Sequence, residues 1–257
     1  MLIPVFMYHA VFKDQQALQG ADHHYGVKTS EFVKQIEQSI TRGLTIGSLQ
    51  NWLKGNDGID TINCIFTFDD GHVSNYDAAM ILAEKGFSGD FFVNSSTIGT
   101  NNFLSKSQLN DMVKMGMSIQ SHGHRHVFMS DLTDDQLSEE LSRSKSEIED
   151  ATNVPVTIFA PPGGRISQRV IERAQELGYE SIANSQPGYL TPSTKISQIP
   201  RVAVYDAMGI AKYTEYLLCH SGVMTKDKSK YFVTATLKKM LGNRNYDRLW
   251  QLLRGTK

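Results

Sequence analysis

Ile62-Asn-Cys-Ile-Phe-Thr-Phe68 runs directly into Asp69-Asp70-Gly71, and this junction determines how the rest of the chain is interpreted. The first seven residues are rich in β-branched and aromatic side chains and stop before a glycine, which predicts a buried strand. About fifty residues further on, His122-Gly-His-Arg-His126 follows a second predicted strand. Carboxylates and imidazoles are the ligand types that a catalytic divalent metal requires. The sequence therefore predicts a metal-dependent hydrolase.

Short apolar runs alternate with amphipathic stretches, a pattern typical of βα units and a mainly parallel sheet. Strands are predicted at Leu2–Met7, Ile62–Phe68, Asp90–Asn94, Met117–Ser121, Val156–Ala160, Glu180–Asn184 and Pro200–Val204. Helices are predicted at Ser30–Arg42, Tyr76–Lys85, Ser105–Lys114, Thr133–Ala151 and Ser167–Leu177. Seven strands fit a closed or nearly closed α/β barrel over residues 1–206. A helical, basic extension over residues 207–257 is expected to pack on this barrel.

Composition limits the classes of function. At 257 residues with 40% hydrophobic side chains, the chain can form one large domain with a sizeable core. A net charge of −1 argues against a nucleic-acid partner. No run approaches the roughly 18 apolar residues that predict a membrane span. Because the first residues lack a basic segment and a small-residue cleavage site, we expect a cytoplasmic protein.

The polar residues suggest a division of labour. Consecutive strand residues point to opposite faces, so Asp69 and Asp70 are not expected to bind one metal while the strand stays regular. One acid would be a ligand and its neighbour a general base. Asp70, His122 and His126 would supply three ligands and leave Asp69 to take a proton; His124 is an alternative ligand. A solvated acidic turn is the competing explanation of the Asp-Gly pair.

Two further segments also follow predicted strands. They therefore fall at the carboxyl-terminal rim, where α/β barrels build their active sites. Pro161-Pro-Gly-Gly164 follows strand Val156–Ala160, and its glycines could let a backbone N–H approach a substrate oxygen. An ordinary strand-to-helix turn explains the same residues. His9 follows the first strand and could either line the site or be a packed or surface histidine.

With these residues in view, the chain resembles the polysaccharide deacetylase family (the NodB-homology domain, carbohydrate esterase family 4) from about Leu2 to Val204. The resemblance implies a distorted (β/α)7 barrel that removes acetyl groups, usually from N-acetylglucosamine units, with a divalent metal. Thr67-Phe-Asp-Asp-Gly71 matches the first family motif, which implies Asp69 as general base and Asp70 as metal ligand. His122 and His126 match the second motif, which implies both as ligands. Zinc is the expected metal, and cobalt, iron or manganese also fit.

The third motif departs from the family pattern. It is usually Arg-x-Pro-Tyr/Phe-Gly, and here it is Ala160-Pro-Pro-Gly-Gly164, so the arginine that orients the base is missing. Arg165 is the candidate to compensate. By position, Gly163 supplies the N–H that binds the oxyanion. Pro161, Pro162, Arg165 and His9 are the residues we expect to bind the substrate.

Two other positions also differ. The second motif has Gly123 where Ser or Thr is usual. Leu218-Cys-His220 has the letters of the late motif that supplies a general acid, which implies His220 as the acid, although it follows a predicted helix, Ala207–Leu217, rather than a strand. The biofilm-polysaccharide branch of the family also includes members with a Met-Tyr-His strand and a varied third motif, and this chain resembles that branch.

The expected function is metal-dependent removal of acetyl groups, mainly N-acetyl groups of N-acetylglucosamine-type units, from an oligo- or polysaccharide of bacterial exopolysaccharide or envelope metabolism. One alternative is an O-acetyl esterase or amide hydrolase with another substrate. A second is a barrel that binds a glycan without turnover. The tail, Thr225–Lys257, is basic with apolar residues at helical spacings. It predicts either a docked helix with a solvated basic face or a surface for an anionic membrane or partner.

Overall fold

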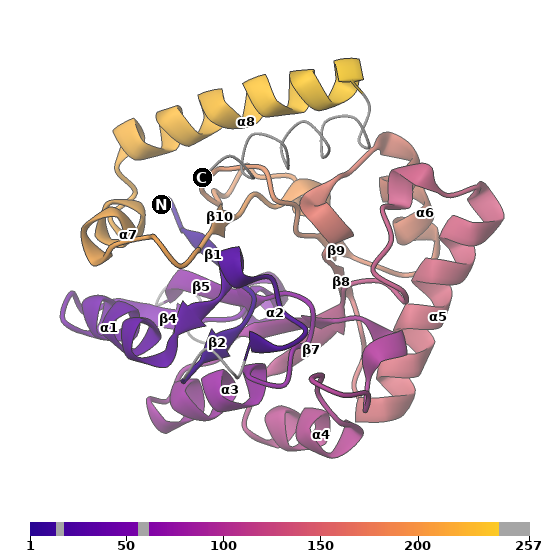
Figure 1. Cartoon of the computed structure of the whole chain (residues 1–257), viewed down its shortest axis with the longest axis horizontal. Helices are drawn as coiled ribbons and strands as arrows, with labels where there is room; N and C mark the ends of the chain where they lie inside the picture. Colours follow the sequence, from indigo (N-terminus) through magenta and orange to yellow (C-terminus); the bar gives the residue numbers. More distant parts are fainter. Residues whose placement is uncertain (14–17, 56–61, 242–257) are drawn as a thin grey trace.

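The structure is a computed structural model, and it describes residues 1–13, 18–55 and 62–241 (Figure 1). Its main sheet is wholly parallel, in the order β10-β1-β5-β6-β7-β8-β9, with β4 also paired to β5. Its strands are β1 (Val5–Tyr8), β4 (Thr45–Gly47), β5 (Ile62–Phe68), β6 (Asp90–Val93), β7 (Ser118–Ser121), β8 (Ile158–Phe159), β9 (Ser181–Ile182) and β10 (Val202–Ala203). A two-stranded sheet pairs β2 (Val11–Phe12) with β3 (Val27–Lys28).

Helices surround the curved sheet (Figure 1). They are α1 (Thr29–Ile40), α2 (Leu49–Lys54), α3 (Asn75–Glu84), α4 (Lys106–Lys114), α5 (Asp134–Thr152), α6 (Gln168–Glu176), α7 (Ile210–Leu217) and α8 (Ser221–Leu241). A capping box is present at the start of α5, with the Thr133 and Gln136 side chains each bonded to the other's backbone N–H. None of the helices in the described ranges is long and apolar enough to cross a membrane.

The predicted distorted (β/α) barrel is confirmed, and all seven predicted strands take part in the main sheet. The two edge strands, β9 and β10, come together through a single parallel bridge between Ala183 and Ile199. The barrel is therefore nearly closed. The carboxyl ends of the parallel strands meet at one rim, which is where a barrel of this kind builds its active site.

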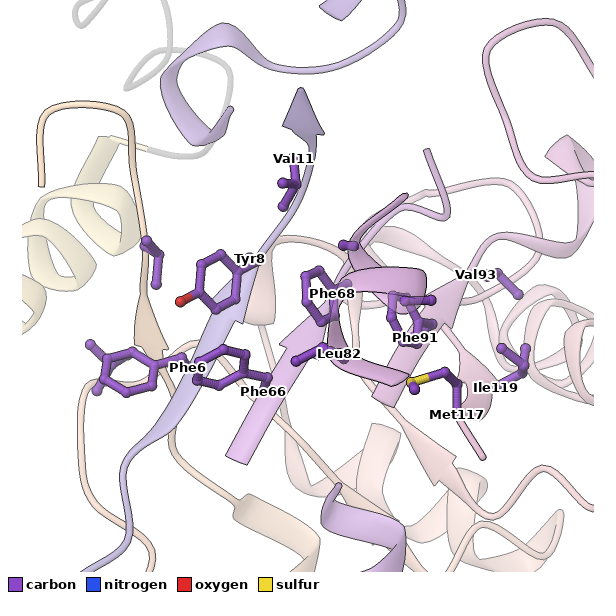
Figure 2. Close-up of a cluster of buried hydrophobic side chains, with 14 of the residues drawn as sticks. Phe6, Tyr8, Val11, Phe66, Phe68, Leu82, Phe91, Val93, Met117 and Ile119 are labelled. Atoms are coloured by element: carbon purple, nitrogen blue, oxygen red, sulfur yellow. The ribbon is translucent and has the colours of Figure 1, made fainter. Parts of the chain in front are cut away.

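Alternate side chains of β5 point to opposite faces of the sheet, and one set packs under the outer helices. Phe66 and Phe68 belong to the large cluster between the sheet and its outer helices, together with Tyr8 of β1 and Phe91 of β6 (Figure 2). The rings of Phe68 and Phe91 stack with centroids 4.5 Å apart, and those of Tyr8 and Phe68 with centroids 5.3 Å apart. Each buried aromatic of this size stabilises the fold by roughly 1.5–3 kcal/mol. This packing fixes the relative positions of β1, β5 and β6, and two of these strands, β1 and β5, end at the site described below.

The extension docks on the barrel through its first part. Tyr213, Tyr216 and Leu217 of α7 and Val223 and Met224 of α8 are buried in the large cluster. In Figure 1, α8 lies as one long helix across the top of the view, leading away from α7. The later residues of the predicted basic tail, 242–257, lie outside the described residues.

Asp90 on β6 is a fully buried acid that supports a neighbouring helix. Its carboxylate accepts hydrogen bonds from the backbone N–H groups of Leu49 (2.5 Å) and Gln50 (3.2 Å), at the start of α2. Burial is the largest effect on this group and raises the pKa of Asp90 to about 6, although these hydrogen bonds favour the charged form. The folded protein therefore binds this proton more tightly than the unfolded chain does.

The resulting prediction concerns stability and pH. Because the folded pKa is raised, the contribution of Asp90 to stability falls as pH rises from about 4 through about 6. Between pH 7 and pH 5 the wild type should regain about 1 kcal/mol through this group. Urea unfolding of wild type and Asp90→Asn, which cannot ionise, measures the difference. Identical pH dependence of the two proteins would contradict the assignment.

Candidate metal and catalytic site

The candidate site lies where β1, β5, β7 and β8 end. The Asp69 N–H donates to the Tyr8 carbonyl at 2.9 Å, which continues the pairing of β1 and β5 one residue past β5. The N–H of His122 donates to the carbonyl of Val93 in the same way beyond β6 and β7. Parallel pairing thus brings the two motifs to one rim, although about fifty residues separate them.

Three potential metal ligands converge at this rim. Among the described residues, Asp70, His122 and His126 form a group whose ligand atoms all lie within 4.8 Å of one another. Oδ1 of Asp70 is 3.3 Å from Nε2 of His122 and 3.2 Å from Nε2 of His126. His122 is buried, whereas the His126 side chain is half exposed. The ligand set predicted from the sequence is therefore assembled, and it opens to solvent on the His126 side.

The chemistry of this set fits a divalent cation. Nδ1 of His122 lies 2.7 Å from the Ala160 carbonyl, which can only accept, so Nδ1 carries the proton and the Nε2 of a neutral ring is free to bind a metal. Oδ1 of Asp70 is buried and has no hydrogen-bond partner in the described part of the chain. An orphaned carboxylate oxygen facing two imidazole nitrogens is a site that a cation would complete. Two imidazoles and a carboxylate suit zinc.

Unusual backbone conformations aim these ligands. Asp70 has φ 76° and His126 has φ 56°, both in the left-handed region that residues other than glycine rarely occupy. The turn at Asp70 breaks the strand alternation directly after Asp69, so the two neighbouring acids both reach the rim. Burial opposes ionisation of Asp70, but the His122 and His126 imidazoles outweigh it and hold the pKa of Asp70 well below its ordinary value. The same carboxylate raises the pKa of His126.

Asp69 is held by a buried arginine, Arg201, which the sequence analysis did not identify. Its guanidinium makes two parallel contacts with the Asp69 carboxylate, at 2.6 Å and 2.8 Å. It also donates to the Thr67 hydroxyl and the Asn184 carbonyl. Burial opposes the charge of Asp69, but Arg201 outweighs this effect and holds the pKa of Asp69 below its ordinary value. The carboxylate is thus kept ionised and fixed in direction.

Arg201 takes the place that the sequence analysis gave to Arg165. It comes immediately before β10, the edge strand beside β1, so it reaches Asp69 at the end of β5 across β1. Arg165 instead lies over the Phe128 ring, 4.1 Å from its centroid, and its Nη1 is buried without a partner among the described residues. The available signal was a charge inside an apolar strand pattern, Pro200-Arg-Val-Ala-Val204. Such a charge is rarely buried unless it is paired.

Glu140 of α5 anchors the histidine loop, residues 122–126, by binding its backbone. This fully buried carboxylate accepts from the backbone N–H groups of His124 and Arg125, each at 3.0 Å, and pairs with the Arg125 guanidinium. His124, the alternative ligand, lies 2.7 Å from the Ser95 hydroxyl and 3.1 Å from Glu147 through the same Nδ1. His124 is therefore a packing residue outside the ligand group. A glutamate on the apolar face of a predicted helix was the signal for this anchor.

The altered positions in the second and third motifs have local explanations. Gly123 has φ 86°, and a Cβ there would lie 2.8 Å from the Met129 side chain. Pro161 and Pro162 are buried next to the histidine loop, and the Pro161 carbonyl accepts from the N–H of Gly164 at 2.8 Å. Gly163 is exposed with φ 66° in this turn, and a Cβ there would meet the Phe128 ring at 2.7 Å. The turn is tight, and it leaves Gly163 open to solvent at the rim.

His9 lies beside the site. It follows β1, its ring stacks on Tyr25 with centroids 4.6 Å apart, and its Nδ1 is buried with no partner among the described residues. Burial lowers the pKa of His9, and the nearby charges of Asp70 and Asp69 partly oppose this effect. His9 is thus an imidazole at the rim that is not part of the ligand group.

The assignment of His220 as the acid has to be corrected. His220 is exposed between α7 and α8, and its carbonyl accepts from the Tyr189 hydroxyl. The thiol of the preceding Cys219 contacts the carbonyl of Leu2, before β1 begins. At about 3.3 Å per residue, the chain from Leu2 to Tyr8 spans roughly 20 Å, which separates His220 from the rim. The letters of the motif match, but α7 carries them to the opposite end of the barrel.

Comparison with known proteins shows which family the chain resembles. The polysaccharide deacetylase family model matches residues 60–182, a segment that contains both aspartates and the histidine loop. YxkH of Bacillus subtilis, which bears the name of a polysaccharide deacetylase, is 29% identical over 154 residues, or 60% of this chain and 55% of that protein. The resemblance to the polysaccharide deacetylase family that the sequence motifs predicted is confirmed.

Two further relatives agree with this assignment. The peptidoglycan-N-acetylglucosamine deacetylase of Bacillus cereus is 30% identical over 118 residues, or 45% of this chain and 53% of that protein. The chain spans about half the length of these curated relatives. The solved structure of the deacetylase PplD from Streptococcus pyogenes has a TM-score of 0.74 at 21% identity and covers 84% of this chain and 98% of that chain. That likeness establishes the NodB-type barrel fold.

Proposed function

We propose that this protein is a metal-dependent deacetylase that hydrolyses N-acetyl groups of N-acetylglucosamine-type units in a bacterial oligo- or polysaccharide. The observation that carries the proposal is the buried Asp69–Arg201 pair next to the converging group of Asp70, His122 and His126. The match to the polysaccharide deacetylase family model supports the deacetylase activity, and the name of the Bacillus cereus relative supports an N-acetylglucosamine substrate. Zinc is the metal we propose, on the donor set alone.

The chain's own residues provide the proton transfers and the orientation. Bound at Asp70, His122 and His126, a divalent cation would act as a Lewis acid on the acetyl carbonyl. Asp69, ionised and fixed by Arg201, takes the proton from the attacking water. Gly163, on the exposed turn, offers its backbone N–H to the tetrahedral oxyanion. The amine departs only when protonated, and we assign this transfer to His9: its ring, neutral because burial lowers its pKa, takes up the proton that Asp69 received and passes it to the amine.

Substitution of His9 should lower kcat, whereas substitution of His220, the other histidine considered as the acid, should not. His9→Ala should lower kcat by about 10²-fold or more, because it removes the proton donor from the rim. His220→Ala should leave kcat within about twofold, because His220 lies beyond the far end of the strands. Steady-state acetate release from N-acetylglucosamine oligomers measures both. Equal losses in the two variants would contradict the assignment of His9.

Product analysis separates N-deacetylation from O-acetyl ester hydrolysis. The zinc-loaded protein is incubated with N-acetylglucosamine oligomers and, separately, with O-acetylated xylan oligomers. We expect acetate together with a new primary amine from the first substrate and little acetate from the second. Acetate from the second substrate alone would replace the proposal by an O-acetyl esterase. Binding of the oligomers with no acetate from either substrate would favour a glycan-binding barrel.

A further inference from the structure

A cavity of about 330 Å³ lies next to the candidate site, between α8 and the rim of the barrel at the ends of β9 and β10. Arg201, which holds Asp69, lines its inner wall. So does Tyr25, whose ring stacks on His9. The Arg201 side chain thus separates the cavity from the proposed base, Asp69, and the Tyr25 side chain separates it from the proposed acid, His9. Its volume is at the lower end of the range for small-molecule sites, about 300–1,000 Å³.

One face of α8 forms the outer wall of this cavity. Asp227, Lys230, Tyr231 and Thr234 line it, at the i, i+3, i+4 and i+7 spacing that places side chains on one helix face. A helix that only packs on a domain buries an apolar stripe there. Here α8 packs the apolar Met224 against the barrel. From Asp227 onward, about one helical turn later, the residues that line the cavity carry carboxylate, ammonium and hydroxyl groups.

The lining combines aromatic surface with charged groups that are mostly paired: Arg201 with Asp69 and Lys212 with Asp227, while Lys230 is exposed to solvent. Tyr231 is half-buried, and burial raises the pKa of its hydroxyl, so it stays protonated and able to donate. Across the cavity, Tyr205 accepts from Lys212 at 2.9 Å, and Lys212 lies 3.9 Å from Asp227. The Asp227 carboxylate is also bonded to the Tyr216 hydroxyl. An uncharged, hydroxyl-rich ring with apolar C–H faces matches such a lining better than an ion does.

We propose that this cavity binds a sugar residue of the glycan that neighbours the acetylated residue, with Tyr231 as its aromatic platform and Thr234 as a hydrogen-bonding partner. The proposal rests on the proposed function in taking the ligand to be the same glycan chain. It makes α8 part of the substrate site, so the protein should recognise an oligomer through this cavity in addition to the acetylated unit at the metal.

The test compares binding of the N-acetylglucosamine monomer and hexamer to the full-length, metal-free protein by calorimetry. Tyr231→Ala should raise the Kd for the hexamer about tenfold, the loss typical of removing an aromatic anchor. Tyr231→Phe should largely restore binding. Phe232→Ala is the matched control, because Phe232 is the next residue of α8, is 57% exposed and does not line the cavity; its ring meets the Tyr231 ring only edge-on, with centroids 6.1 Å apart. With zinc, Tyr231→Ala should raise KM for the hexamer about tenfold and leave kcat unchanged.

The outcomes separate this inference from the proposed function. Weaker hexamer binding by Tyr231→Ala but not by Phe232→Ala supports the sugar site, even if no acetate is released by any protein. Equal hexamer binding by wild type and Tyr231→Ala overturns it, even if both release acetate. Failure of the wild type to bind the hexamer at all also overturns it. Thermal unfolding of each variant establishes that a loss of binding is not a loss of fold.

Discussion

Replacing Arg201 by alanine should cost both folding stability and activity. The substitution leaves the buried Asp69 carboxylate without its partner, and breaking a buried ion pair from one side typically costs about 3–5 kcal/mol. Activity should fall by about 10²-fold or more, because the base loses the group that fixes its direction. Urea unfolding and acetate release from N-acetylglucosamine oligomers measure the two effects. Arg173→Ala, which removes only a surface pair with Glu176, should cost less than about 1 kcal/mol.

Arg201→Lys distinguishes orientation from folding. Lysine keeps the positive charge but cannot reproduce the two parallel contacts with Asp69. Arg201 holds the pKa of Asp69 below its ordinary value, so a weaker partner should move the acid limb of kcat/KM to higher pH. Wild-type activity and an unshifted pH profile in this variant would show that Arg201 has no positioning role.

Removing one imidazole of the ligand group should abolish tight zinc binding. His122→Ala deletes a buried ligand whose ring is already held by the Ala160 carbonyl, so zinc affinity should fall at least about 100-fold. Calorimetry measures the affinity directly. Zinc at 100 times its Kd should also stabilise the folded wild type by about 2.7 kcal/mol, and the variant by far less.

A neighbouring histidine provides the control for this experiment. His124→Ala removes a ring that bonds to Ser95 and lies outside the ligand group, so zinc affinity should stay within a few-fold of wild type even if stability falls. Equal loss of zinc affinity in His122→Ala and His124→Ala would contradict the ligand set.

The parts of the fold that could be predicted from the sequence are those that local pattern specifies. Ile62–Phe68 was predicted with the bounds it has in the structure, because a continuous apolar run ending at Asp-Gly has only one natural interpretation. Strand β4 and helix α2 were missed. β4 has three residues and α2 has six, too few to show the alternation of a strand or the 3.6-residue period of a helix.

Local sequence patterns also identified only part of the candidate site. Asp70, His122 and His126 were found because residue type and local spacing identify them. Arg201 lies 132 residues from Asp69, and only the closure of β10 against β1 brings the two together. His220 illustrates the opposite error, since its motif letters match while its helix carries it to the far end of the barrel. A contact that depends on sheet order cannot be derived from local patterns.

The most direct test of the account is acetate release from N-acetylglucosamine oligomers during a stepwise zinc titration of the metal-free protein, with wild type and Asp69→Asn compared. We predict that wild type gains activity in proportion to bound zinc. Asp69→Asn should bind zinc comparably and release acetate about 10²–10⁴-fold more slowly. Equal rates in the two proteins, or wild-type activity that does not depend on zinc or another divalent cation, would contradict the account.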